Sequence, residues 1–143
     1  MGLREFSMSH RYATFGDEPI FEIEDVSGIL VLAMVEDPST ANYQSRQFES
    51  NRVQRLIYEG EARSLVFDME LCTFLDSITV EILIALTTSV RRSGGDAVMA
   101  GMTYEVAELL GRLMVLQPDA KRALWNNFPS RRHAIEALNA GAN

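Results

Sequence analysis

The sequence predicts an α/β domain in which a mixed sheet of four to five strands is covered by about four helices. Two observations lead to this prediction. Residues 65–67 and 97–100 are apolar runs that are too short for helices, as expected of buried strands. Between them, residues 78–90 form an apolar-rich segment that is long enough for almost four helical turns and is followed by a Gly-Gly pair. A strand, a crossover helix and a second strand predict parallel neighbours in one sheet.

The N-terminal part of the chain predicts an arm and a hairpin. Residues 1–19 are polar and mixed and contain no apolar signal segment, so we expect them to form an arm outside a single domain at residues 20–140. Residues 21–24 alternate apolar and polar side chains, which indicates an edge strand. A Ser-Gly turn follows, and residues 29–35 then predict a buried strand that pairs with the first one.

The remaining elements follow from start and stop signals. Asp37 and Pro38 indicate a helix start, and residues 41–59 predict a helix that ends at Gly60. After the central unit, Thr103 can cap a further helix. Residues 124–128 predict a short last strand, and residues 129–138 predict the final helix.

The polar corner formed by Asp76 and Ser77 is the candidate functional site. Both residue types favour the N-cap position, because their side-chain oxygens accept hydrogen bonds from unpaired backbone N–H groups. At about 100° per residue, one face of the helix that follows should lie on the sheet. The residues on that face are Ile78, Ile82, Leu83, Leu86 and Val90. Val80 and Ile84 fall outside this face, so they would suit a docking surface, although a neighbouring helix could equally cover them.

Ser77 is the residue in this corner that could carry a modification. Most serines at a helix start are only caps. A phosphoryl group there would be favoured by the helix dipole and by free N–H groups. It would add about 1.5 to 2 negative charges beside Asp76 and Glu81, and would therefore repel a partner that binds the adjacent apolar surface.

The order of these motifs suggests a family. The runs VFDMELCTFLDSITVEILIAL and SGGDAVMAGMTYEVAELL, at about residues 65–113, resemble the STAS domain of bacterial anti-sigma-factor antagonists. The segment LWNNFPSRRHAIEAL resembles the last short strand, Pro-Ser turn and final helix of that family. The resemblance implies a STAS-like fold and a regulatory binding module, not an enzyme, and it implies no catalytic residue and no cofactor.

The resemblance also implies a regulatory cycle. In the family, the serine after the corner aspartate is the phosphoacceptor for a serine protein kinase that doubles as an anti-sigma factor, and a phosphatase resets it. By motif position this serine is Ser77. The family usually has glycine where this chain has Thr79, so Thr79 becomes a rival acceptor. We expect Asp76, Val80 and Ile84 to contact the partner. The alternative is a STAS-like scaffold, or an interaction subunit of a signalling complex, that is never phosphorylated.

Composition excludes several other classes of protein. The 143 residues carry a net charge of −7, which argues against a nucleic-acid partner. No apolar run approaches the roughly 18 residues of a membrane span. A single cysteine, Cys72, fits a reducing compartment, so we expect a cytoplasmic protein. Weak homo-oligomer formation is left open by the sequence.

Motifs of enzymes and metal sites do not match. The sequence contains neither G-x-G-x-x-G nor G-x-x-x-x-G-K-[ST], and the two histidines, His10 and His133, are too far apart in sequence to suggest a metal site. Asp68 could be a phosphoacceptor aspartate of the response-regulator type. That chemistry needs a lysine after a late strand, and the only lysine, Lys121, is badly placed.

Overall fold

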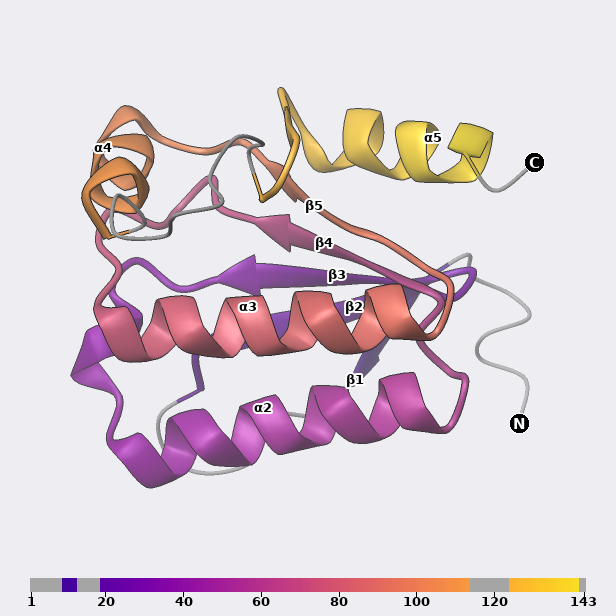
Figure 1. Ribbon diagram of the computed structural model, residues 1–143, viewed down its shortest axis with the longest axis horizontal. Coiled ribbons are helices and arrows are strands. Elements are labelled where there is room, and N and C mark those ends of the chain that lie inside the picture. Colours follow the sequence, from indigo (N-terminus) through magenta and orange to yellow (C-terminus); the bar gives the residue numbers. More distant parts are fainter. Residues whose placement is uncertain (1–8, 13–18, 114–123, 142–143) are drawn as a thin grey trace.

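The computed structural model describes residues 9–12, 19–113 and 124–141 (Figure 1). The elements in chain order are β1 (Ser9–Tyr12), β2 (Phe21–Val26), β3 (Ile29–Met34), the 3-10 helix η1 (Pro38–Thr40), α2 (Tyr43–Tyr58), β4 (Ser64–Asp68), α3 (Ser77–Arg92), β5 (Ala97–Ala100), α4 (Tyr104–Leu113), β6 (Asn127–Phe128) and α5 (Arg131–Gly141). The predicted α/β class is therefore confirmed.

The sheet is mixed, as predicted, and its strands follow the order of the sequence from β1 to β6. The pairs β1–β2 and β2–β3 are antiparallel, and the pairs from β3 to β6 are parallel. The sheet has six strands and not four to five, because Ser9–Tyr12 pairs with β2. Assigning these four residues to an arm outside the domain was wrong. Their pairing satisfies backbone groups that β2 would otherwise leave open at the edge of the sheet. The rest of the predicted arm, except Pro19, lies outside the described residues.

The predicted turn between the first two domain strands is confirmed. Ser27 and Gly28 have φ angles of 53° and 90°. A two-residue hairpin loop of this kind needs positive φ at both central positions, which is why glycine suits the second one. The Oδ1 atom of Asp25 accepts a hydrogen bond from the N–H of Gly28 at 2.7 Å and holds the turn.

Helices cover both faces of the sheet. α2 and α3 lie side by side on one face, and α5 packs against β4, β5 and β6 on the other (Figure 1). Successive side chains of a strand point to opposite faces. In β4, Leu65 and Phe67 therefore enter the large core under α2 and α3, and Val66 enters the smaller core beside Ala134 of α5.

The parallel strands place the candidate site. β3, β4 and β5 run in the same direction, so their carboxyl ends lie at one edge of the sheet. The connections that follow these three strands lead to η1, α3 and α4, respectively. Ser77 is the first residue of α3 and therefore lies at this edge.

Candidate functional site

The loop between β4 and α3 holds the corner in a fixed position. The N–H of Met69 donates to the carbonyl of Ala100 at 2.8 Å, and the N–H of Thr73 donates to the carbonyl of Glu36 at 2.9 Å. The loop is thereby tied to β5 on one side and to the segment after β3 on the other. Bonds of this kind leave the chain little freedom immediately before α3.

Of the two N-cap candidates in the sequence, Asp76 and Ser77, it is Asp76 that caps α3. Its backbone is extended, with φ −101° and ψ 171°. Its Oδ1 atom accepts a hydrogen bond from the N–H of Thr79 at 3.0 Å, and its carbonyl accepts one from the N–H of Val80 at 3.1 Å. These two bonds define where the helix begins.

A buried arginine on α2 reaches this cap. The Nη1 atom of Arg46 lies 2.7 Å from Oδ2 of Asp76 and 3.4 Å from Oγ1 of Thr79. The side chain of Arg46 is 7% exposed and that of Asp76 is 26% exposed. Sequence reasoning missed Arg46. The available signal was its spacing from Val53 and Ile57, which places a charge on the core stripe of a helix, where it needs an opposite charge.

The ion pair keeps Asp76 charged. Burial raises the pKa of the Asp76 carboxyl, but hydrogen bonds from Arg46 and Thr79 favour the carboxylate and outweigh the burial. The net result is a pKa below the usual value for aspartate. Asp76 is therefore a carboxylate at neutral pH, next to the exposed Ser77.

The two candidate acceptors, Ser77 and Thr79, differ in accessibility. Ser77 is exposed, whereas Thr79 is completely buried. Two positions correspond to about 200° around a helix, so their side chains leave α3 on nearly opposite sides. In the folded protein the hydroxyl of Thr79 is enclosed and accepts a hydrogen bond from Arg46, so of the two candidates only Ser77 is accessible to a kinase.

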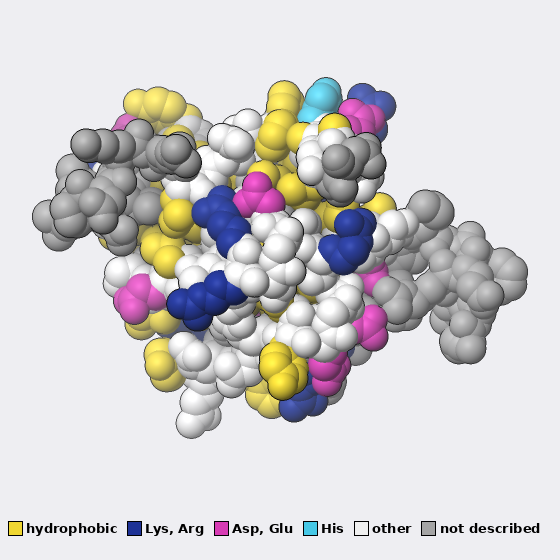
Figure 2. Space-filling view, turned by 45° about the vertical axis from the view of Figure 1, so that its right-hand side comes forward, with side chains coloured by type: hydrophobic (Ala, Val, Ile, Leu, Met, Phe, Trp, Pro, Cys, Tyr) yellow, Lys and Arg dark blue, Asp and Glu magenta, His cyan; other side chains and the backbone are white. Residues whose placement is uncertain are grey.

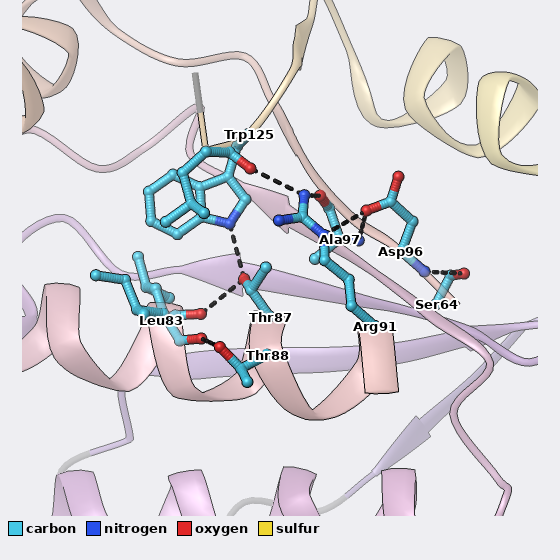
Figure 3. A network of polar contacts seen from close by, with 10 residues as sticks. Ser64, Leu83, Thr87, Thr88, Arg91, Asp96, Ala97 and Trp125 are labelled. Carbon is cyan, nitrogen blue, oxygen red and sulfur yellow. Dashed lines mark hydrogen bonds and ion pairs between the residues drawn. The ribbon is translucent and has the colours of Figure 1, made fainter. Parts of the chain in front are cut away.

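The expected docking role of Val80 must also be corrected. Val80 is 5% exposed and belongs to the large core. It shares a helix face with Thr87, two turns further along, and the indole N–H of Trp125 donates to the hydroxyl of Thr87 at 2.7 Å (Figure 3). The segment that carries Trp125 extends the buried face of α3 beyond the sheet side. Ile84 is partly buried and packs against the same core, so only part of it reaches solvent.

Exposed apolar side chains lie near the corner, although sequence reasoning did not identify them. Leu71 is 69% exposed, Phe74 is 41% exposed and Tyr104 is 77% exposed. A hydrogen bond of 2.9 Å from the hydroxyl of Thr103 to the carbonyl of Cys72 joins the start of α4 to the loop that carries the other two. We call Leu71, Phe74 and Tyr104 the end patch.

The sequence profile of the STAS domain matches residues 21–118 of the chain, which is more than half of its length. The chain belongs to the STAS domain family. No curated protein sequence matches it.

Solved structures resemble this STAS domain in fold. The Bacillus cell fate determinant SpoIIAA in its phosphorylated form is 14% identical, with a TM-score of 0.63 over 82% of this chain and 98% of that chain. A putative anti-sigma factor antagonist of Thermotoga maritima is 14% identical, with a TM-score of 0.64 over 83% of this chain and 94% of that chain. The murine anion transporter Slc26a9 is 13% identical, with a TM-score of 0.58 over 92% of this chain and 22% of that chain.

The surroundings of Asp68 and Cys72 do not suit either residue for covalent chemistry in this STAS domain. The carboxylate of Asp68 lies 2.8 Å from Nε of Arg131, whose Nη1 also lies 3.0 Å from Glu24. It is therefore held by an ion pair and not open to phosphorylation. Cys72 is completely buried, and burial raises the pKa of its thiol to about 11, so it is not a thiolate nucleophile at neutral pH.

Among residues 9–12, 19–113 and 124–141 there is no group of three or more side chains that could hold a metal ion. Within the same ranges, none of the helices combines the length and the apolar character that a membrane span requires.

A hollow of about 510 Å³ lies at the other end of the sheet. Its lining includes Gly60, Arg63, Gly94, Asp96 and Leu138. Figure 2 looks more directly at this end, where arginine side chains, in dark blue, lie around the centre of the view. The hollow borders the amino ends of β3 and β4, so it does not reach the corner at their carboxyl ends.

Proposed function

We propose that this STAS domain is an anti-sigma-factor antagonist-like module that binds a cognate anti-sigma factor with serine kinase activity and is switched by phosphorylation of Ser77. The unphosphorylated form binds the kinase, the phosphorylated form releases it, and a cognate phosphatase resets the module. The module works by binding in the cytoplasm, and we assign no catalytic step to its residues.

The placement of Ser77 is the observation that supports this proposal most. Ser77 is exposed at the start of a well-capped helix and directly follows a charged aspartate. The rival Thr79 is enclosed, so a kinase that acts on the folded domain would meet only one hydroxyl in the first turn of α3.

The end patch supplies the apolar part of the expected partner surface. Val80 is buried and cannot contact a partner, and Ile84 can contribute only its exposed part to the partner surface. Glu70 and Glu105 are exposed next to members of the patch, so the surface combines apolar contact with negative charge. Phosphorylation would place a strongly hydrated group of about 1.5 to 2 negative charges at the border of the apolar contact, and the cost of desolvating that charge would weaken binding of a partner that packs on the patch.

Binding to a candidate anti-sigma factor tests the proposal. We expect Ser77→Ala to bind like the wild type and Ser77→Asp to bind more weakly by about 1–3 kcal/mol, roughly a 5- to 150-fold rise in Kd, because the added carboxylate is desolvated beside Asp76. Thr88→Asp is the matched control, since Thr88 is exposed on the same side of α3 about three turns away. Equal binding by all three variants would contradict a switch at Ser77.

Phosphopeptide mapping tests the modification itself. Trypsin should release residues 64–91 in one piece, because no lysine or arginine precedes Arg91 in that stretch. Fragment ions must then separate Ser77 from the other hydroxyl residues of the peptide. Phosphate on Ser77 that changes between resting and stressed cells would support the proposal.

The second candidate function is a scaffold or interaction subunit of a signalling complex that uses the same surface without phosphorylation. The threonine at position 79 favours it, because the family usually has glycine there. Absence of phosphate from Ser77 under every condition, together with binding that survives Ser77→Asp, would favour this second function.

A further inference from the structure

The ion pair between α2 and the cap of α3 raises a question about the phosphorylated state. A phosphoryl group on Ser77 would lie beside the N-terminus of a helix, where backbone N–H groups attract anions. The carboxylate of Asp76 already occupies this position through the N–H of Thr79. The two anions would therefore compete for the same end of α3.

Arg46 is placed to decide this competition. Its hydrogen bonds go to Asp76 and Thr79, which both belong to the first turn of α3 or its cap. Its Nε atom is buried and has no hydrogen-bond partner among the described residues. Loss of Asp76 from its position would leave a buried guanidinium without its charged partner, which is strongly unfavourable.

Arg46 itself lies away from the acceptor. It contacts Thr79 on the buried side of α3, and Ser77 leaves the helix on the nearly opposite, exposed side. A phosphate on Ser77 therefore does not meet the guanidinium while the cap is intact. Arg46 can act on the phosphate only through Asp76.

We propose that Arg46 is a positioning residue that holds Asp76 on the N–H of Thr79 and so prevents a phosphoryl group on Ser77 from taking over the helix start. The phosphate then stays directed toward solvent, and the switch acts through its charge without rebuilding α3. This inference rests on the proposed phosphorylation of Ser77.

Phosphoserine can be encoded at position 77 of the full chain, so the test does not depend on finding the kinase. The observable is the chemical shift of the Thr79 amide between pH 5 and pH 8, followed by NMR. An amide that donates to a phosphate follows its second ionisation, with a midpoint near pH 6. In the phosphorylated wild type we expect the Thr79 amide to show no such transition.

Variants of α2 then isolate the role of Arg46. In the phosphorylated Arg46→Met protein, the Thr79 amide should titrate with the phosphate, and Arg46→Lys should restore part of the wild-type behaviour. Arg55→Met is the matched control, because Arg55 is an exposed arginine on the same helix. A structural loosening alone would broaden or shift the amide without linking it to the phosphate.

Failure of this inference can be distinguished from failure of the proposed function. A titrating Thr79 amide in the phosphorylated wild type would overturn the inference, even where Arg46→Met fails to fold. It would also be overturned by an amide that ignores the phosphate in Arg46→Met, or one that follows it equally in Arg55→Met. Failure of the proposed function appears elsewhere, as absence of phosphate from Ser77 in cells, and leaves this NMR result unchanged.

Discussion

Asp76 has two tasks at once, because it caps α3 and neutralises a buried arginine. We expect Asp76→Ala to destabilise the domain by about 3–5 kcal/mol, since it leaves the charge of Arg46 unpaired in addition to removing the cap. Asp76→Asn keeps a capping oxygen, so it should cost about 1 kcal/mol less than the alanine variant. Urea unfolding measures both values. An asparagine variant as stable as the wild type would show that Arg46 does not depend on this carboxylate.

The acid dependence of the same variant follows from the lowered pKa of Asp76. A carboxyl with a folded-state pKa below its unfolded value stabilises the fold above the unfolded value, which is about 3.9 for aspartate. This contribution disappears as the pH falls through the folded-state pKa. The stability difference between the wild type and Asp76→Asn should therefore shrink below about pH 3.9.

The pKa of Glu49 is shifted in the opposite direction to that of Asp76, upward. Glu49 is 2% exposed, and its Oε1 atom accepts hydrogen bonds from the N–H groups of Ile20 and Phe21 at 3.0 and 3.1 Å. Burial raises the pKa of this carboxyl, although the two backbone bonds and the nearby charge of Arg52 oppose the shift. Ionisation of Glu49 therefore costs more free energy in the folded protein than in the unfolded chain.

Glu49→Gln tests the effect of this upward pKa shift on stability, because the amide oxygen of glutamine can accept the same two hydrogen bonds but does not titrate. The stability of the wild type relative to this variant should rise as the pH falls through the folded-state pKa of Glu49. The rise should level off below about pH 4.3, the unfolded value for glutamate. Urea unfolding at several pH values gives the difference, and a decrease on acidification would contradict the prediction.

The sequence predicted the role of a residue where that role depends only on neighbours in the sequence. The capping role of Asp76 depends on a bond to a residue three positions away, so the pattern around the helix start limited the cap to Asp76 or Ser77. Arg46 is 30 positions from Asp76, and its role depends on how α2 packs beside α3. No local pattern could identify that pair, although the charge on the core stripe of α2 was visible.

The contrast between local and long-range causes also holds for whole helices and strands. Start and stop residues predicted α3 to within two residues at each end, because capping is local. The sequence left open whether Val80 is covered by a neighbouring element, because such cover depends on packing between segments that are distant in the sequence; in the structure Val80 is 5% exposed. A helix that packs against more than a sheet has a wider buried face than its apolar stripe suggests.

The contact between α3 and Trp125 yields a prediction at this scale. Trp125 is 6% exposed, and its ring packs edge-on against Phe67 with 6.2 Å between centroids. Thr87→Val keeps the shape of the side chain but leaves the indole N–H without its acceptor. We expect a loss of about 1–3 kcal/mol. Thr88→Val is the matched control, because Thr88 is exposed and bonds back to Ile84, so it should change stability by less than about 0.5 kcal/mol.

Fluorescence follows this experiment directly, since Trp125 is the only tryptophan in the chain. Unfolding in urea can be read from its emission, and the native emission should differ between the Thr87 variant and the Thr88 variant. Equal losses in the two variants would show that the hydrogen bond to Thr87 contributes no more than an exposed hydroxyl does.

For the whole molecule, the order of strands could be predicted from spacing, but the extent of the sheet could not. The crossover helix between residues 68 and 97 indicated parallel neighbours, and the structure confirms β4 beside β5. β1 was missed because its four residues carry no clear pattern, and its place depends on the open edge of β2. An edge strand of this kind is specified by its partner more than by its own sequence.

The end patch allows partner binding to be separated from stability at this scale. Tyr104 is 77% exposed, so Tyr104→Ala should change the free energy of unfolding by less than about 0.5 kcal/mol. It should nevertheless weaken binding to the partner by about 1–3 kcal/mol, because exposed aromatic residues at an interface are frequent anchors. Tyr58→Ala is the matched control. Tyr58 is 90% exposed at the end of α2, near the hollow, and should affect neither property. Both variants can be compared by urea unfolding and by titration with the candidate anti-sigma factor. Equal binding by the two variants would mean that the partner does not use the end patch, even if Ser77 proves to be its switch.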